Sequence, residues 1–279
     1  MRKKYPKPGA KTVKAKKRIQ TLTGIATAPR SARALLPIVC LALLAAGLLG
    51  IDPIATAQDQ TSDVSFKTPE EAITFYIQGV AQGDVPKLMQ ACAIDEMSER
   101  FRFDLYVNRL QALTPQAPAP SDYPFYAEMN KAQFSWQILF QARNLAYGLL
   151  TTEEGVLEGR TVIYKDPEET TRFMNEVDPE RLAQLQVTQI GVPYPELASS
   201  ERNLENWDRQ AQIYGADELT EWVALLLFEG DYYYVGFTLL RYGDNWKISS
   251  ANSALGYTNA LGTPQKTTEE EFQELVGGN

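Results

Sequence analysis

The chain has 279 residues and a formal net charge of −8, and its length allows one or two globular domains. It contains no histidine. That excludes Ser-His-Asp and Cys-His nucleophilic sites, imidazole-based zinc or iron sites, and a histidine switch near neutral pH.

The charge is divided unevenly along the chain. Residues 1–51 contain eleven Lys and Arg and no acid, so the remainder holds 16 cations against all 35 acids, a net charge of −19. A region this acidic repels phosphate and offers no basic stripe, which argues against nucleic-acid binding. An acidic cation-binding face is an alternative to a solvated surface. However, the acidic clusters within 166–169 and 176–180 do not match the calcium-loop pattern, and we predict no metal site.

The first 67 residues have the organisation of an export leader. A basic region, 1–33, precedes eighteen uncharged and mostly apolar residues, 34–51, and a polar linker, 52–67. We expect the basic end to stay in the cytoplasm and the acidic region to lie on the outer side of a membrane. Ala55-Thr56-Ala57 fits the small-x-small pattern for cleavage, so Ala57 and Gln58 flank a possible cut.

Cleavage and retention are two alternatives for this leader. An apolar helix of this length spans ~27 Å, just enough to cross the hydrocarbon core. The basic region is much longer than the usual charged start of a signal peptide, which favours an uncleaved single-pass anchor. Cys40 is preceded by Val39 rather than by a small residue, so we do not predict lipidation.

Two helices are predicted at the start of the exported region. Thr68 is a natural N-cap, Pro69 suits the first helical position, and apolar residues follow with helical spacing at Ile73, Tyr76, Ile77 and Val80. Gly83 ends this helix, and Asp84 caps a second, short helix over 85–92. Cys92 is the only cysteine outside 34–51. We interpret it as a buried small hydrophobe rather than a reactive thiol, because no cation lies nearby in sequence.

The middle of the chain is predicted to be mainly helical. Helices are expected over 103–113, over 125–150, within the acidic stretch 166–184, and, as an exposed helix, over 201–214. The proline-rich stretch 114–124 is expected to be a loop, and 156–164 and 186–190 are expected to be strands. In the longest helix an apolar stripe is formed by Phe134, Ile138, Leu139, Leu145 and Leu149, and it is widened by Trp136 and Phe140.

The C-terminal part predicts an antiparallel meander. Three strand-like runs, 219–228, 232–242 and 246–252, are separated by Glu229-Gly230-Asp231 and Gly243-Asp244-Asn245, which have turn chemistry. Residues 262–279 are interpreted as an acidic, flexible tail.

The order of these elements resembles the nuclear-transport-factor-two-like superfamily, also called ketosteroid-isomerase-like. The matching residues are Thr68–Ala93, with the Thr-Pro-Glu-Glu-Ala helix start, and Trp222–Asn252, which contains Asn-Trp-Lys-Ile. The resemblance implies an α+β fold in which helices pack against a curved, cone-like antiparallel sheet. It makes 68–261 a single domain and 97–218 a largely helical insertion. Enzymes of the superfamily use Asp, Tyr and often His in the cone, and no residue here matches such a catalytic position.

If the cone holds a pocket, its walls are the expected ligand-binding site. In the central predicted strand, alternate residues share a face, so Tyr233 and Phe237 lie on one side and Tyr232 and Tyr234 on the other. We cannot choose between these faces from the sequence. The full set of candidate wall residues is Tyr76, Tyr232, Tyr233, Tyr234, Phe237 and Trp246. Ordinary core packing is the alternative for each of them. Asp95 and Glu96 are either a carboxylate pair at a pocket mouth or solvated acids.

These observations leave three functional hypotheses. The first is a non-catalytic extracytoplasmic module, without a cofactor, that binds a small apolar molecule or another envelope protein. The second is a cofactor-free isomerase or lyase that uses Asp, Glu and Tyr in the cone. The third is a structural or assembly protein of the cell envelope. The absence of histidine and of a second exported thiol favours the first.

Overall fold

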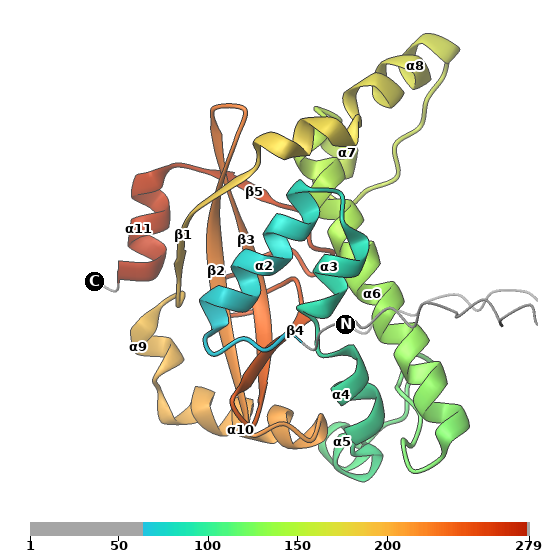
Figure 1. The fold of residues 1–279 in the computed structure, drawn as a ribbon, viewed down its shortest axis with the longest axis vertical. Coiled ribbons are helices and arrows are strands. Elements are labelled where there is room, and N and C mark those ends of the chain that lie inside the picture. Colours follow the sequence, from blue (N-terminus) through green and yellow to red (C-terminus); the bar gives the residue numbers. More distant parts are fainter. Residues whose placement is uncertain (1–63, 278–279) are drawn as a thin grey trace, which may run out of the picture. The chain divides into compact units, whose positions relative to one another are not determined.

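A computed structural model describes residues 64–277, which lie in a unit that extends from Thr61 to Asn279 (Figure 1). The leader predictions for 1–63, including the apolar segment 34–51 and the cut between Ala57 and Gln58, fall outside the described residues. Within 64–277, no helix is both long enough and apolar enough to cross a membrane.

A five-stranded antiparallel sheet forms the centre of the described unit. Its order is β1 (Gln186–Gly191), β2 (Glu218–Phe228), β3 (Asp231–Tyr242) and β4 (Asn245–Ser250), and β5 (Gln265–Thr267) also pairs with β3. The predicted meander and the strand near 186–190 are therefore confirmed. Glu229 and Gly230 both have positive φ, 49° and 89°, as a tight two-residue hairpin turn requires.

Three helices follow one another at the start of the unit: α2 (Pro69–Ala81), α3 (Val85–Gln90) and α4 (Ile94–Arg100). Both predicted caps are present. The Thr68 hydroxyl accepts a hydrogen bond from Glu71 N at 3.3 Å, and the Asp84 carboxylate accepts one from Lys87 N at 2.9 Å. Helices α2 and α3 approach closely at Gly79, where a Cβ would lie 2.7 Å from the backbone nitrogen of Leu88.

The next two helices are α5 (Phe103–Leu110) and α6 (Pro124–Leu150), joined by the predicted proline-rich loop. Buried Gln141 connects α6 to the segment that follows β4. Its amide oxygen accepts from Ala251 N at 2.9 Å, and its amide nitrogen donates to Ser250 Oγ at 2.9 Å and to Ala260 O at 3.1 Å. The long helix is thereby held against the edge of the sheet near β4.

The apolar stripe predicted on α6 is only partly correct. Phe134, Ile138 and Leu145 are buried in the core, but the side chain of Trp136 is 64% exposed and Leu139 is also exposed. The aromatic residues thought to widen the buried stripe therefore lie on a different face of the helix.

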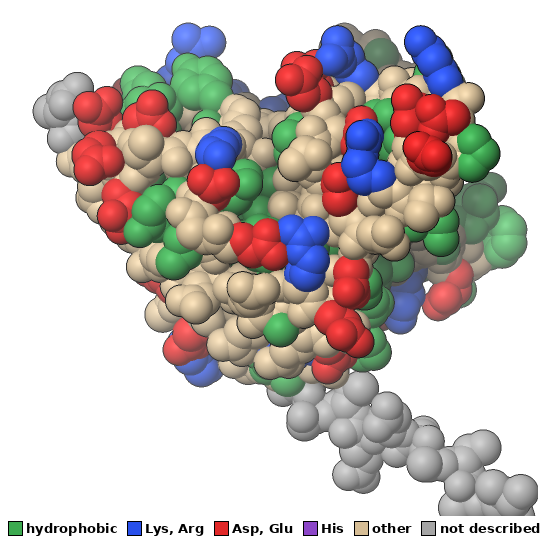
Figure 2. Space-filling model, turned by 90° about the horizontal axis from the view of Figure 1, so that it is seen from above, with side chains coloured by type: hydrophobic (Ala, Val, Ile, Leu, Met, Phe, Trp, Pro, Cys, Tyr) green, Lys and Arg blue, Asp and Glu red, His purple; other side chains and the backbone are tan. Residues whose placement is uncertain are grey.

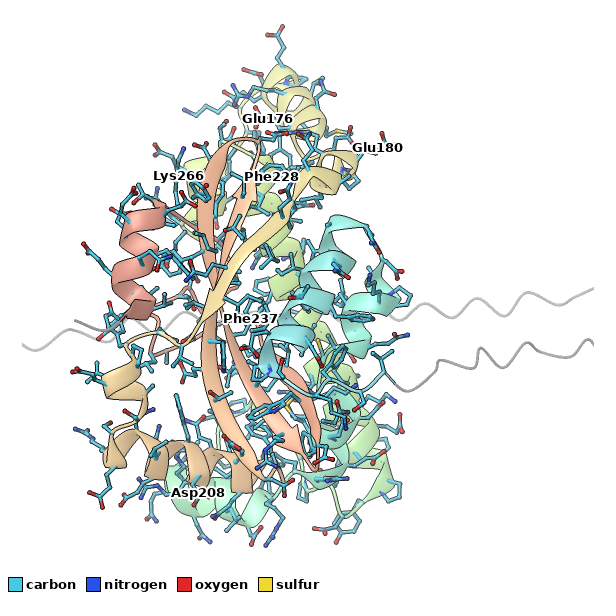
Figure 3. The ribbon with its side chains drawn as sticks, turned by 60° about the vertical axis from the view of Figure 1, so that its left-hand side comes forward. Glu176, Glu180, Asp208, Phe228, Phe237 and Lys266 are labelled. Atoms are coloured by element: carbon cyan, nitrogen blue, oxygen red, sulfur yellow. The ribbon has the colours of Figure 1, made fainter. Side chains whose placement is uncertain are left out.

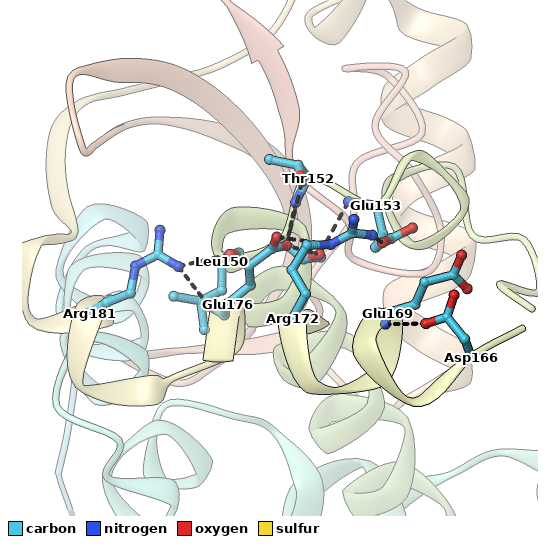
Figure 4. A network of polar contacts seen from close by, with 9 residues as sticks. Leu150, Thr152, Glu153, Asp166, Glu169, Arg172, Glu176 and Arg181 are labelled. Atoms are coloured by element: carbon cyan, nitrogen blue, oxygen red, sulfur yellow. Dashed lines mark hydrogen bonds and ion pairs between the residues drawn. The ribbon is translucent and has the colours of Figure 1, made fainter. Parts of the chain in front are cut away.

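A short helical stretch follows, with α7 (Glu154–Leu157), α8 (Pro167–Glu176) and the 3-10 helix η2 (Pro179–Gln184). Arg181 joins this stretch to α6 and to the β2–β3 hairpin. Its guanidinium donates to Leu150 O at 3.0 Å and to Glu176 O at 2.6 Å (Figure 4). It also donates to both oxygens of Glu229, at 2.8 and 2.5 Å. Glu176 in turn accepts hydrogen bonds from Thr151 and Thr152.

The strand predicted over 156–164 is wrong. Val156 and Leu157 lie in α7, Gly159 with φ of 69° follows the helix, and the residues up to 165 belong to no strand. The apolar residues Val162, Ile163 and Tyr164 are typical of a strand, but no strand among the described residues pairs with this stretch.

Helices α9 (Pro195–Ala198) and α10 (Glu201–Ile213) precede β2. The predicted helix over 201–214 is confirmed, but it is not simply exposed, because Trp207, Ala211 and Ile213 are buried. Trp207 donates its indole N–H to the buried carboxylate of Glu221 at 3.3 Å, and that carboxylate also accepts from Ser253 Oγ and Leu255 N, both at 2.7 Å. Glu221 thus ties α10, β2 and the loop after β4 together.

The flexible tail predicted for 262–279 is wrong for its described part, because β5 and α11 (Glu269–Gly277) form there. Thr268 and Glu271 make a reciprocal capping box: Glu271 N donates to the Thr268 hydroxyl and Thr268 N donates to the Glu271 carboxylate, at 3.2 and 3.1 Å. Phe272 is 1% exposed and packs with Val223 and Leu225 on the sheet. Burial of this ring is the interaction that orders the tail.

The predicted α+β class is confirmed. Helix α2 packs on one face of the sheet, where Val235, Phe237 and Leu239 of β3 join the main core, and α11 covers part of the opposite face. Figure 3 shows Phe237 near the middle of the sheet, beside α2. Figure 2 shows acidic and basic side chains interspersed on one end of the unit, so that face presents no field of a single sign.

Replacing Arg181 with alanine is expected to lower the free energy of unfolding by about 1–3 kcal/mol, because four hydrogen bonds are lost and two carbonyls lose their donor. Urea unfolding at pH 7 measures this. Arg209→Ala is the control, since its one ion pair, with Glu205 at 3.8 Å, is exposed.

The Arg181 guanidinium holds the pKa of Glu229 below its ordinary value. The stabilisation from the Arg181–Glu229 ion pair is fully present above the ordinary pKa of a glutamate, and it is lost as the pH falls through the lowered pKa of Glu229. The difference in free energy of unfolding between the wild type and the Arg181→Ala variant should therefore become smaller in acid. An equal loss in both variants would contradict the role of Arg181.

Candidate functional site

Two of the residues predicted to line a pocket fill the interior instead. The rings of Tyr76 on α2 and Phe237 on β3 meet edge to face with their centroids 5.6 Å apart, and both side chains are fully buried. Aromatic pairs of this kind are a dense form of core packing. Where α2 crosses the sheet, the cone is closed by its own side chains.

The other four predicted residues are divided between the two faces of the sheet. Tyr233 and Trp246 are partly buried and pack against the main core. Tyr232 and Tyr234 pack on the opposite face, against the cluster formed around Phe272. The structure therefore does not bring the six aromatic residues into one site.

A pocket of about 600 Å³ lies at the rim of the core instead. It is formed by the first described residues and by parts of α3, α4, α6 and β4. Its polar and charged lining residues are Gln90, Cys92, Asp95, Glu96, Lys131, Ser135 and Lys247, and its apolar ones are Val64, Pro86, Met89 and Ile94. The volume falls in the range of small-molecule sites, and the lining combines an apolar wall with a few convergent polar groups.

Lys247 is the most unusual group in this rim pocket. Its residue is only 6% exposed, on β4 between Trp246 and Ile248. The ammonium donates one hydrogen bond, to Gln90 O at 2.7 Å, and lies over the ring of Phe66 at 5.6 Å from the centroid. No carboxylate among the described residues lies within ion-pairing distance of it. Since an ammonium has three N–H donors, two remain for other partners.

Asp95 and Glu96 line the rim pocket. A position at a pocket was one of the two alternatives predicted for them. They occupy the first turn of α4, which suits carboxylates because the helix dipole is positive there. Asp95 is mostly exposed and forms an ion pair with Lys131 of α6 at 2.5 Å. Asp95 in turn raises the pKa of Lys131.

Glu96 is the more deeply placed carboxylate, and it is half-buried. Burial raises the pKa of Glu96, while its own backbone N–H and the nearby cations Lys247 and Arg100 act in the opposite direction. Burial is the larger effect. A carboxyl group that holds its proton more tightly than usual, beside an ammonium with free donors, is suited to hydrogen bonding with a ligand.

Cys92 lies at the inner side of the pocket. It is 5% exposed, and its thiol donates to Leu88 O at 3.3 Å. Burial raises the pKa of this thiol strongly, so the nucleophilic thiolate is disfavoured. Beneath it, the Tyr76 hydroxyl is buried and has no hydrogen-bond partner among the described residues. Cys92 is therefore a weakly polar side chain in the pocket wall, whereas Tyr76 is not among the residues that line the pocket.

The acidic clusters considered for cation binding have structural roles here. Asp166 caps α8 by accepting from Glu169 N at 2.9 Å, and Asp178 caps η2 by accepting from Glu180 N at 3.0 Å (Figure 4 shows the first). Among residues 64–277, no group of three or more Asp, Glu or Cys side chains is placed to hold a metal ion.

The sequence does not predict the burial of Lys247, which the meander places in the core. The available signal is a lysine between an aromatic and a β-branched residue inside a strand, in Asn-Trp-Lys-Ile. That pattern predicts the strand, but it does not show which side chains the strand buries.

Comparison with known proteins gives one structural similarity. A cystatin-like protein from Ruminococcus gnavus, known from a crystal structure, superimposes with a TM-score of 0.46 and 18% sequence identity. The match covers 76% of this chain and 43% of the other, so it spans less than half of that protein's length. No protein-family model matches the sequence, and no curated protein sequence matches it.

Replacing Glu96 with glutamine is expected to raise the free energy of unfolding near neutral pH. The folded-state pKa is raised, so the charged carboxylate costs stability above its ordinary pKa, and the cost disappears as the pH falls below that value. The gain from Glu96→Gln should therefore shrink in acid. Urea unfolding at pH 7 and pH 4 measures it, with exposed Glu99→Gln as control. A Glu96→Gln variant that is less stable at pH 7 would contradict the assigned burial.

Proposed function

We propose that residues 68–261 form a non-catalytic extracytoplasmic module that binds a small organic molecule in the rim pocket. In this proposal the basic region 1–33 stays in the cytoplasm and 34–51 anchors the module in the membrane. The linker 52–67 then carries it on the outer side. The placement outside is supported by the charge asymmetry, with all 35 acids after residue 51.

The observation that carries the proposal is the Lys247 ammonium. It is buried, has one carbonyl partner, and lines a pocket of about 600 Å³. Burying a cation without an ion-paired carboxylate costs stability, so such a group is kept where a ligand or a reaction uses it. An anionic group of a ligand would satisfy the two free N–H donors with charge-assisted hydrogen bonds.

The rest of the pocket limits the chemistry of the ligand. Glu96 offers a carboxyl group that can accept from, or when protonated donate to, a polar group near the acid. Val64, Met89 and Ile94 offer an apolar wall. We therefore propose an organic acid with a short apolar part and a second polar group, such as a hydroxyl or an amine. This replaces the purely apolar ligand that the aromatic residues suggested, because those residues are occupied in packing.

We also propose that the domain is a divergent member of the nuclear-transport-factor-two-like superfamily. The support is the order of a Thr-Pro-Glu-Glu helix and a second short helix before a β2–β3–β4 meander on which the first helix packs. In this reading 97–218 is the insertion, and it supplies α5 to α10 together with β1.

A second candidate is a cofactor-free isomerase or lyase with Glu96 as the general acid or base. The raised pKa of Glu96 favours it, because proton transfer near neutral pH needs a carboxyl group shifted in this direction. The two functions differ in what Glu96→Gln does. A binding module keeps most of its affinity for the organic acid, whereas an enzyme loses turnover while still binding.

Thermal unfolding with a library of small organic acids tests the binding function. Residues 58–279 are suitable, since they contain the whole unit that begins at Thr61. A ligand present at tenfold its Kd stabilises by about 1.4 kcal/mol, or about 3–5 °C in Tm for a domain of this size.

Lys247→Met should remove this shift, because methionine keeps the buried length of the side chain and deletes the ammonium. Lys87→Met, which removes a half-buried cation from α3 outside the pocket, should leave the shift unchanged. If no organic acid stabilises the wild type, or if both variants respond alike, the binding proposal is wrong.

A further inference from the structure

One face of α6 is apolar and exposed along most of the helix. At 100° per residue, Phe125, Met129, Ala132, Trp136 and Leu139 project within about 40° of a common direction. The buried residues Phe134, Ile138 and Leu145 project from the opposite side. The helix therefore has two apolar faces, of which only one contacts the core of the described unit. We call the exposed one the α6 aromatic face.

The side chains of the α6 aromatic face are large and open to solvent. Phe125 is 71% exposed, Trp136 is 64% exposed and Met129 is 53% exposed. Trp136 and Phe140 stack with their centroids 5.1 Å apart, and the Arg143 guanidinium lies 4.8 Å from the centre of the Phe140 ring. Contiguous exposed apolar surface of this kind marks an interaction site rather than a scattered surface residue.

The lack of acidic residues at the centre of this face indicates which type of partner it can bind. The exported part of the chain has a net charge of −19, yet the five residues that define the α6 aromatic face are all apolar, with one acid, Glu128, at its margin and Arg143 at its C-terminal end. Trp, Tyr and Phe are the side chains preferred where lipid headgroups meet acyl chains. A zwitterionic lipid surface suits such a face, since it imposes no repulsion between the lipid and the acidic remainder of the domain.

The position of the chain entry provides the second argument. Val64 lines the rim pocket together with Lys131 and Ser135 of α6, so the segment that precedes Val64 joins the domain beside this helix. Twelve residues, 52–63, separate Val64 from the apolar segment 34–51, and twelve extended residues span at most ~43 Å. A tether this short keeps the α6 aromatic face at high effective concentration near the membrane surface.

We infer that α6 lies along the outer surface of the membrane, with its aromatic face inserted between the lipid headgroups. The inference rests on the proposed membrane anchor at 34–51 and goes beyond it. In this inference α6 docks the domain on the bilayer surface, so the domain is not attached to the membrane through its linker alone.

Fluorescence quenching of the full chain in phosphatidylcholine vesicles tests this. The sequence has four tryptophans, all after residue 135, so residues 1–63 contribute no tryptophan signal. Lipids brominated in the upper part of the acyl chain should quench the wild type. Trp136→Phe should lose this quenching, while Trp222→Phe, which removes a partly buried tryptophan of β2, should keep it.

A second pair of variants tests the face rather than the fluorophore. Met129→Glu with Leu139→Glu should abolish the quenching of Trp136, because charge is placed on the inserted face. The control, Ile163→Glu with Met174→Glu, changes two apolar residues outside α6 that are even more exposed, and it should leave the quenching intact.

Flotation of the same vesicles separates the anchor from the docking. A chain that does not float would overturn the anchor and this inference with it. A chain that floats but shows no quenching of Trp136 would overturn the inference alone, and crosslinking of two copies through α6 in that state would assign the face to a homodimer.

Discussion

The contact between Tyr76 and Phe237 is the constraint on which the rest of the domain depends. Helix α2 lies on the sheet at the level of Phe237, and the two fully buried rings occupy the space that a cone would otherwise leave open. Because β3 pairs with β2, β4 and β5, its position sets the position of every strand except β1. The packing of Tyr76 on Phe237 therefore fixes how α2 lies on the sheet and fills the interior between them.

Because the interior is filled by side chains, the polar groups of the candidate site lie at the rim of the core. Lys247 and Glu96 sit where α3, α4 and α6 approach β4, at the edge of the packed region rather than in its centre. There the side chains are shielded enough for burial to raise the pKa of Glu96, but they still line an open pocket. The burial of Lys247 and of Glu96 each costs stability, and the nearby Lys247 offsets part of that cost for Glu96, which is the pattern expected of a site maintained for binding.

The sequence predicted those parts of the fold whose causes are local. Caps at Thr68 and Asp84, and a hairpin turn at Glu229 and Gly230, depend on residues a few positions apart, so the helices and the meander were found with nearly correct limits. What failed depends on distant contacts. Phe272 orders the C-terminal segment only because Val223 and Leu225 are there to receive it. The capping box at Thr268 and Glu271 is a local signal for the same helix, so here a local cause and a distant contact act together.

The candidate site shows the same division. The choice between the two faces of β3 could not be made from its alternation, because both faces are covered, one by α2 and the other by α11. The sequence allows a pocket position for Asp95 and Glu96 as one of two alternatives, because the two acids follow a predicted helix directly, but it does not predict α4, on which they lie. Lys247 was not foreseen, because its burial arises from α3 and from Phe66, more than 150 residues away in the sequence.

The account as a whole is tested most directly by locating where a bound organic acid sits. Crystals of residues 58–279 soaked with small hydroxy and amino acids would give the position of the ligand. We predict its carboxylate on the Lys247 ammonium at the rim, with the Tyr76 and Phe237 rings still in contact. A ligand found between those two rings, or in a pocket away from Lys247, would contradict the account.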